Sequence, residues 1–227
     1  MEVKVQAAID HERRTDADRK RDRNRQPMAM LTFLGLQDDM QVLKLLPGRS
    51  GWYTKTLGPV LEEKAKLFLS IGTDSVSTMI ADKPGFSTTE IIPFGGIAQS
   101  TVEEHRATVP GFSFSIRELD MVLTFRNVHN FDATGRASLN AAAFEVFNKG
   151  GRYAVVDLTR RHMQPDSNEV WRRIDPVQVI KEVEATGFKF VDYSDLHYKP
   201  DDDLRHEVGR KSVTGNTDRF TLLFEKP

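Results

Sequence analysis

Short apolar runs alternate with longer amphipathic segments along most of the chain. Each apolar run is bounded by glycine, proline or polar residues, and runs of this kind predict buried strands. The longer segments, in which apolar residues recur with helical spacing, predict helices. Strands are predicted at 42–46, 67–71, 120–125, 152–158, 188–193 and 220–225.

The predicted helices lie between these strands. They cover 53–66, 133–148 and 176–186. The third has a good N-cap in Asp175 and a stop signal in Gly187. Each of these helices is long enough to cross from the end of one strand to the start of a parallel neighbour.

The segment 73–117 gives the weakest pattern in the chain. Prolines and glycines recur along it and interrupt every candidate element. Only a short strand fits, at 90–94. We therefore expect this segment to be largely irregular.

The N-terminal segment is dominated by charge. From His11 to Arg25 it reads HERRTDADRKRDRNR, with arginines and lysines interleaved with acidic residues. Opposite charges three or four positions apart predict an exposed helix held by ion pairs. A lid or a partner-docking helix is the alternative. Pro27 then permits a new helix start, with an apolar face that extends to Leu36.

Strands separated by helices predict parallel βαβ units with helices on both faces of one sheet. The last two predicted strands are separated only by a polar loop, 194–219, so the last strand is expected to run antiparallel. The chain has no internal repeat and no linker long enough to divide it. We therefore expect an α/β fold with a seven-stranded, mainly parallel sheet in 37–227 and an N-terminal helical extension in 1–36.

Composition narrows the function classes. The chain has 227 residues, of which 39% are hydrophobic and 29% charged, as in a globular protein. A net charge of −1 argues against binding to nucleic acid or to an anionic membrane. The absence of cysteine excludes disulfides and thiolate metal sites. His197 and His206 flank three aspartates at 201–203, but no recognised ligand spacing is present, so no metal site is expected.

The apolar runs and the N-terminal stretch indicate where in the cell the protein is expected. No apolar run approaches the roughly 20 residues that span a bilayer. The N-terminal stretch MEVKVQAAIDHERR lacks the apolar segment of a secretory signal. We expect a cytoplasmic protein.

The junction after the first predicted strand is the first candidate site. Ligands of open α/β sheets bind beyond the carboxyl ends of the strands. Gly48 and Gly51 allow a tight turn and a close approach of the backbone to a ligand, and the following helix offers its N-terminal amides. An ordinary structural turn would have the same spacing.

The chain as a whole resembles a known family. The segments that carry the resemblance are AIDHERRTDADRKRDRNRQP, LLPGRSGWYT, DMVLTFRNVHNF, GGRYAVVDL, RIDPVQVIKEVEATGFKFV and TGNTDRFTLLFEKP. Together they resemble the predicted class I S-adenosylmethionine-dependent methyltransferases of bacterial type. The resemblance implies a Rossmann-like class I methyltransferase fold and a small-molecule substrate. It also implies that S-adenosylmethionine contacts Pro47, Gly48, Gly51, Trp52, Tyr53 and Asp74.

The loop Arg126 to Asn130, directly after the strand predicted at 120–125, matches the family segment that lies beside the substrate and the transferable methyl group. At this place in the fold we expect His129 to be a general base supported by Asn127 and Asp157, and Arg126 and Asn130 to bind substrate. Asp157 could alternatively take the proton itself. Histidine suits proton removal near neutral pH. The structural alternative is that His129 and Asn130 cap the loop and that Asp157 caps a turn or pairs with a nearby arginine.

Three replacements set this sequence apart from the family pattern. Lys44 stands where members usually have an acidic residue, and Arg49 and Ser50 stand where glycines are typical. At the end of the second strand, 70–72 offers no carboxylate for the ribose hydroxyls, and Asp74 comes slightly late. Loss of such a hydrogen bond costs about 1.5–3 kcal/mol. We expect S-adenosylmethionine as the cofactor. The replacements predict that its binding is weakened or lost.

Three functions remain open from the sequence. The first is a small-molecule methyltransferase that uses S-adenosylmethionine. The second is an enzyme of the same fold that no longer needs the cofactor and catalyses isomerisation, cyclisation or elimination. The third is a non-catalytic pseudo-enzyme. An open pocket between 47–53, 126–130 and Asp157 would favour an enzyme, and one plugged by Arg49 or Trp52 would favour the third. The charged N-terminal arm predicts a homodimer.

Overall fold

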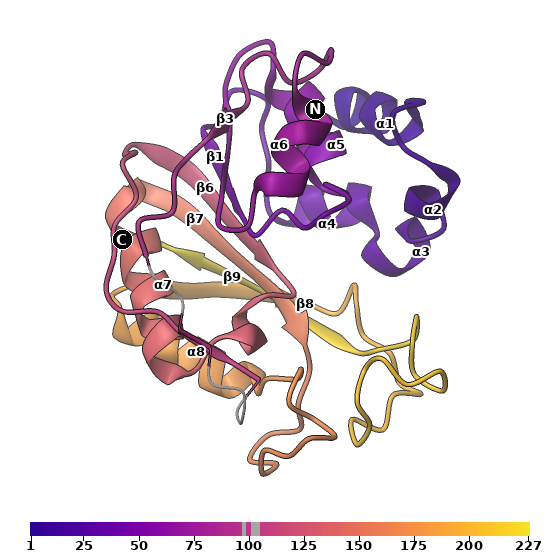
Figure 1. Ribbon diagram of the computed structural model, residues 1–227, viewed down its shortest axis with the longest axis vertical. Helices are drawn as coiled ribbons and strands as arrows, with labels where there is room; N and C mark the ends of the chain where they lie inside the picture. Colours follow the sequence, from indigo (N-terminus) through magenta and orange to yellow (C-terminus); the bar gives the residue numbers. More distant parts are fainter. Residues whose placement is uncertain (97–98, 101–104) are drawn as a thin grey trace.

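The computed structural model describes residues 1–96, 99–100 and 105–227 and has a seven-stranded sheet at its centre (Figure 1). All strands of this sheet are parallel except the last in the chain, which is antiparallel to both of its neighbours. This confirms the predicted α/β sheet and its antiparallel last strand. Across the sheet the order is β3 (Glu90–Ile91), β2 (Leu67–Ser70), β1 (Val42–Leu45), β6 (Leu119–Phe125), β7 (Phe147–Leu158), β9 (Arg219–Glu225) and β8 (Lys189–Ser194).

Helices cover both faces of the sheet, because alternate residues of the strands are apolar on both sides. On β1, Leu43 and Leu45 belong to one buried cluster and Val42 to the other. The first cluster includes α7 (Ala133–Val146) and α8 (Pro176–Ala185). The second includes α1 (Glu2–Asp10), α4 (Pro27–Phe33), α5 (Thr54–Leu61) and α6 (Asp74–Ile80), which lie together in the upper part of Figure 1. In the described part of the chain, no helix combines the length and the apolar character needed to cross a membrane.

Segment 73–117 contains more regular structure than its sequence predicts. Helix α6 occupies Asp74–Ile80, and β4 (Gln99–Ser100) pairs antiparallel with β5 (Ala107–Thr108). The prediction that every element here is interrupted was wrong for α6, because its seven residues contain no glycine or proline. An acidic residue in the first turn also favours this helix through the helix dipole.

The charge spacing of the N-terminal segment predicts one exposed helix, but the structure does not contain it. The segment forms two single turns, α2 (Asp16–Arg19) and α3 (Asp22–Arg25). The break before α2 is fixed by a capping box, in which Thr15 and Asp18 exchange hydrogen bonds with each other's backbone amides. Asp18 is also buried rather than solvated, because its carboxylate pairs with Lys55 at 2.7 Å. The segment is therefore part of the packed structure.

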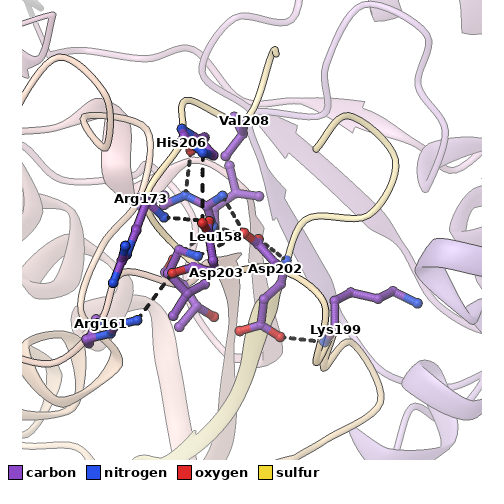
Figure 2. A network of polar contacts seen from close by, with 12 residues as sticks. Leu158, Arg161, Arg173, Lys199, Asp202, Asp203, His206 and Val208 are labelled. Carbon is purple, nitrogen blue, oxygen red and sulfur yellow. Dashed lines mark hydrogen bonds and ion pairs between the residues drawn. The ribbon is translucent and has the colours of Figure 1, made fainter. Parts of the chain in front are cut away.

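A buried ion pair fixes the long loop between β8 and β9 (Figure 2). The guanidinium of Arg173 donates to both carboxylate oxygens of Asp202, at 2.9 and 3.0 Å, and neither side chain is exposed. Asp202 also accepts hydrogen bonds from the backbone amides of Leu204 and Asp218, at 3.1 and 2.7 Å. Arg173 donates in addition to the carbonyl of His206 at 3.1 Å. Arg173 also donates to the carbonyl of Thr159, directly after β7, at 3.1 Å, so this pair ties the interior of the loop and its end at Asp218 to the end of β7.

Replacing Asp202 with alanine should lower the free energy of unfolding by about 3–5 kcal/mol, because Arg173 would remain buried without its counter-charge. Urea unfolding measures the loss. Asp203→Ala is the matched control: the neighbouring carboxylate is half exposed, so its removal should change stability by no more than about 0.5 kcal/mol. Equal losses in the two variants would show that the buried pair does not hold the loop.

Candidate functional site

A cavity of about 360 Å³ opens at the carboxyl ends of β1 and β6, and we call it the strand-end cavity. Its walls come from the turn after β1, the residues after β6, the N-terminal extension and the start of β9. This is the edge where an open α/β sheet binds its ligands. The lining residues are Arg21, Arg25, Lys44, Leu46, Pro47, Gly48, Arg49, Ser50, Trp52, Tyr53, Phe125, Arg126, Asn127, Val156 and Arg219.

Three of the strands that end at this edge, β1, β2 and β6, are followed by a strained residue. Leu46 after β1, Ile71 after β2 and Arg126 after β6 have φ angles of 45°, 66° and 63°, which non-glycine residues rarely adopt. Arg126 is held in this conformation by a 2.6 Å hydrogen bond from its amide to the carbonyl of Val156 on β7. Strain of this kind is usual at functional sites, where surrounding structure over-determines the backbone.

Lys44 is the buried cation of the strand-end cavity. Its side chain is only 1% exposed, and its ammonium donates to the carbonyl oxygens of Leu45 and Leu46 and lies 5.0 Å from the ring centre of Phe125. Burial lowers the pKa of Lys44 to about 7, with a smaller contribution from Arg25. The amine and ammonium forms are therefore both populated at neutral pH, as a proton-transfer group requires.

Four arginines meet at one side of the strand-end cavity, and we call them the arginine cluster: Arg21, Arg25, Arg126 and Arg219. Burial lowers the pKa of Arg25 to about 9 and that of Arg219 to about 10, and repulsion from the other arginines of the cluster adds to both effects. These values still leave the cluster cationic at neutral pH. The buried Nε atoms of Arg126 and Arg219 have no hydrogen-bond partner in the described structure.

Aromatic rings rather than acids support these cations. The guanidinium of Arg25 lies 4.5 Å from the ring centre of Trp52 and 5.2 Å from that of Tyr53. On the other side of Trp52, Arg14 lies at 4.9 Å. The Trp52 side chain is fixed by a 2.9 Å hydrogen bond from its indole nitrogen to the carbonyl of Asp18. Trp52 therefore forms a wall of the cavity and does not fill it.

No aspartate or glutamate is among the described residues that line the strand-end cavity, whereas six lysines and arginines are. The acids of the adjacent extension are engaged elsewhere. Asp22 pairs with Arg14, and Asp18 pairs with Lys55. The cavity consequently has a strongly positive potential.

His129 and Asp157 form a buried pair behind the loop that follows β6. The Nδ1 atom of His129, in the 3₁₀ turn Val128–Asn130, is 2.6 Å from a carboxylate oxygen of Asp157. Asp157 also accepts the backbone amides of His129 and Leu158, at 3.2 and 2.7 Å. The pair thus ties the exit of β6 to β7. In the part of the chain that the structure describes, no three His, Asp or Glu side chains are grouped to hold a metal ion.

The structure brings together part of the residue set that the sequence indicated. Pro47, Gly48, Trp52, Tyr53, Arg126 and Asn127 line the strand-end cavity. Gly51, Asp74, His129, Asn130 and Asp157 are not among its lining residues.

Sequence reasoning missed Arg21, Arg25 and Arg219 as site residues. The first two lie in the charged segment whose spacing suggested an exposed helix, and Arg219 starts the last strand. Their only signal in the sequence is an excess of arginine in 11–25. Nothing in the sequence places that segment beside the last strand.

No protein-family model matches the chain, and no sequence among curated proteins matches it. Solved structures do match. An S-adenosylmethionine-dependent methyltransferase from Aquifex aeolicus aligns over 100% of this chain and 99% of its own, with 14% identity and a TM-score of 0.58. The [4+2]-cyclase SpnF aligns over 96% and 85%, with 15% identity and a TM-score of 0.58. The glycopeptide N-methyltransferase MtfA aligns over 91% of each chain, with 13% identity and a TM-score of 0.57. The chain therefore has the class I methyltransferase fold.

Lys44→Met should raise the free energy of unfolding at pH 7 by about 1–4 kcal/mol, because a buried cation is replaced by an apolar side chain of similar length. The pKa of Lys44 falls from 10.5 to about 7 on folding, so between these values the unfolded chain binds a proton that the folded chain lacks. The loss of stability caused by burying the Lys44 ammonium is therefore greatest below pH 7. It decreases as the pH rises from 7 and is absent above pH 10.5.

Chemical denaturation of both proteins at pH 7 and pH 9.5 tests this dependence. The stability gap between Lys44→Met and the unaltered protein should shrink at the higher pH. Lys66→Met is the control, since Lys66 is half exposed and its replacement should give a small gap that is the same at both pH values. A Lys44→Met gap that does not change with pH would mean that the ammonium is not desolvated.

Proposed function

We propose that the protein is an enzyme that transforms a small molecule in the strand-end cavity without S-adenosylmethionine. The reaction class is isomerisation, cyclisation or elimination, in which a proton is moved within or out of the substrate. The observation that carries this proposal is the lining of the cavity: six cations, one of them Lys44 with a pKa of about 7, and no carboxylate among the described residues.

S-adenosylmethionine does not fit this lining. The cofactor carries a sulfonium, an ammonium and a carboxylate, so a molecule with a net positive charge would enter a cavity lined by six cations and no described carboxylate. Its ribose hydroxyls need an acceptor at the end of β2, but the hydroxyl of Ser70 there donates to the carbonyl of Ile92 at 2.9 Å. Asp74 begins α6 and does not line the cavity. The arginines would attract the carboxylate of the cofactor, but its two cations would meet like charges without a carboxylate partner in the described lining, and such juxtaposition opposes binding.

Lys44 is the proton-transfer group of the proposed reaction. Its neutral amine takes a proton from a carbon acid of the substrate, and the resulting ammonium returns that proton to another atom of the product or to the leaving group. A base with a pKa close to the working pH typically contributes about 10²–10⁴-fold in rate. We place the base at Lys44 and not at His129, because Lys44 lines the cavity and His129 does not.

His129 and Asp157 then have a positioning role in this proposal. Their buried pair holds the turn that carries Arg126 and Asn127 into the cavity wall. Asn127 supplies an amide for orienting the substrate, and its Nδ2 already lies 3.4 Å from the carbonyl of Leu45. The open cavity favours an enzyme over a pseudo-enzyme, since Trp52 forms its wall without filling it.

Small-molecule methyl transfer is the second candidate. The observation in its favour is the likeness in fold to structures described as methyltransferases, one from Aquifex aeolicus and one acting on glycopeptides. The cyclase among the similar structures is named for a reaction other than methyl transfer. The two candidates differ in whether the cofactor binds at all.

Calorimetric titration with S-adenosylmethionine should give a dissociation constant weaker than about 1 mM, because the pocket repels its sulfonium. S-adenosylhomocysteine lacks that charge and should bind more tightly than S-adenosylmethionine if either binds. Lys44→Asp, which restores an acidic side chain, should improve the affinity of both. Micromolar binding of S-adenosylmethionine to the unaltered protein would favour the second candidate.

Proton transfer can be followed while the substrate is still unidentified. In a dialysed protein solution with cofactor-free metabolite extract in D₂O, at least one small molecule should gain deuterium or rearrange, as detected by mass spectrometry. The Lys44→Met variant should slow this change by about 10²-fold or more. A change that occurs only after S-adenosylmethionine is added, with a gain of a methyl group, would contradict the proposal.

A further inference from the structure

A second cavity adjoins the strand-end cavity on the other side of the arginine cluster. Its volume is about 320 Å³, and we call it the loop cavity because much of its wall belongs to the loop between β8 and β9. The four arginines of the cluster line both cavities. The remaining lining residues of the loop cavity are Asn24, Val208, Thr214, Gly215 and Thr217.

The arginine cluster is therefore accessible from two sides. The carboxylate of Asp157 offsets part of the lowering of the pKa of Arg126 and Arg219, but Asp157 lines neither cavity. No described aspartate or glutamate lines the loop cavity or the strand-end cavity. The whole chain has a net charge of −1, so the positive charge is concentrated here by the fold and is not a property of the composition. Such a concentration of cations favours anions in the enclosed space.

The hydrogen-bonding groups of the cluster also remain available. The guanidinium of Arg25 contacts the rings of Trp52 and Tyr53, and it donates no side-chain hydrogen bond to another described residue. Arg219 uses one terminal nitrogen, which donates to the carbonyl of Asn24 at 2.9 Å, while its Nε has no partner. The Nε of Arg126 is likewise buried and without a partner. Guanidinium groups bind carboxylate and phosphate oxygens well, and those of the cluster line both cavities, although the buried Nε atoms of Arg126 and Arg219 face away from the open space.

We propose that the two cavities form one binding site for a small molecule with at least two negative charges, carried by carboxylate or phosphate groups that lie at the arginine cluster. The apolar part of the ligand lies in the strand-end cavity against Tyr53 and Phe125. Thr217 and Asn24 supply further polar contacts on the loop side. This site gives the substrate class for the reaction proposed above, and it rests on that proposal only for the chemistry that follows binding.

The enclosed geometry selects a small molecule over a polymer. Each cavity has room for a few ring- or chain-sized groups, and the cluster lies between them and not on a flat face. The loop cavity is bounded by a loop that the Arg173–Asp202 pair fixes, so its wall is preformed. A preformed wall reduces the ordering cost of ligand binding.

Calorimetry and thermal shift with three aromatic probes test the site. Phenyl phosphate and isophthalate are dianions with phosphate and carboxylate chemistry, and benzamide is a neutral molecule of similar size. At least one of the two dianions should bind about tenfold more tightly than benzamide, or better. Its affinity should fall as the salt concentration rises. A preference between phosphate and carboxylate identifies the ligand chemistry.

The variants are chosen so that they leave the fold intact. Arg21→Gln alters an exposed member of the cluster, and Arg126→Gln alters a member with no hydrogen-bonded side-chain partner at Nε. Each should weaken dianion binding about tenfold while leaving the ligand-free melting temperature unchanged or higher, because repulsion within the cluster is relieved. Arg117→Gln, which is exposed and outside both cavities, should bind as the unaltered protein does.

Equal affinity for the dianions and benzamide would overturn the proposal, as would cluster variants that bind as the unaltered protein does. A lowered melting temperature in Arg21→Gln and Arg126→Gln without loss of dianion affinity would assign the cluster a structural role instead. These outcomes are independent of the proposed reaction. If the protein binds both the dianions and micromolar S-adenosylmethionine, the proposed anion site stands, and the proposed cofactor-free reaction is wrong.

Discussion

The repulsion among cations at the carboxyl edge of the sheet is the constraint around which this molecule is arranged. Lys44 is buried at the end of β1, and the arginine cluster adds four more positive charges at the same edge. Water is largely excluded from Lys44, so the repulsion between this cation and its neighbours is screened less than it would be in solvent. Aromatic rings stabilise these charges, because Trp52, Tyr53 and Phe125 each make a cation–π contact. These contacts stabilise the charges without neutralising them, and the cavity stays positive.

The carboxylates that would neutralise the site are used elsewhere to hold the walls in place. Asp18 fixes Lys55 at the start of α5, and Asp202 fixes Arg173 beneath the loop between β8 and β9. Asp157 is engaged by His129 and by two backbone amides. Each pair joins segments distant in sequence, so these acids fix the segments that surround the cavities. Removing an acid from such a pair is costly because a buried charge remains, whereas the cluster itself has no such partner to lose.

The sheet was predictable from the sequence because each strand has a local signature. An apolar run such as 67–71 is bounded by turn residues, and the polar loop at 194–219 correctly indicated an antiparallel final strand. The turn at 47–53 was also predictable, since ligand sites of this fold lie at strand ends. The arginine cluster was not, because its members come from the N-terminal extension, the exit of β6 and the start of β9. Their meeting depends on tertiary packing that no local pattern records.

In the function proposed above, Lys44 is the side chain that changes what a common fold binds. The resemblance to methyltransferases places an acidic residue there, where it would face a cationic cofactor. A lysine at the same buried position reverses the sign of the field and, with a pKa of about 7, introduces a group that exchanges protons at neutral pH. The surrounding arginines agree with the lysine in sign, so the replacement is part of a consistent electrostatic pattern. A random loss of the cofactor site would not require that agreement, whereas recognition of an anion does.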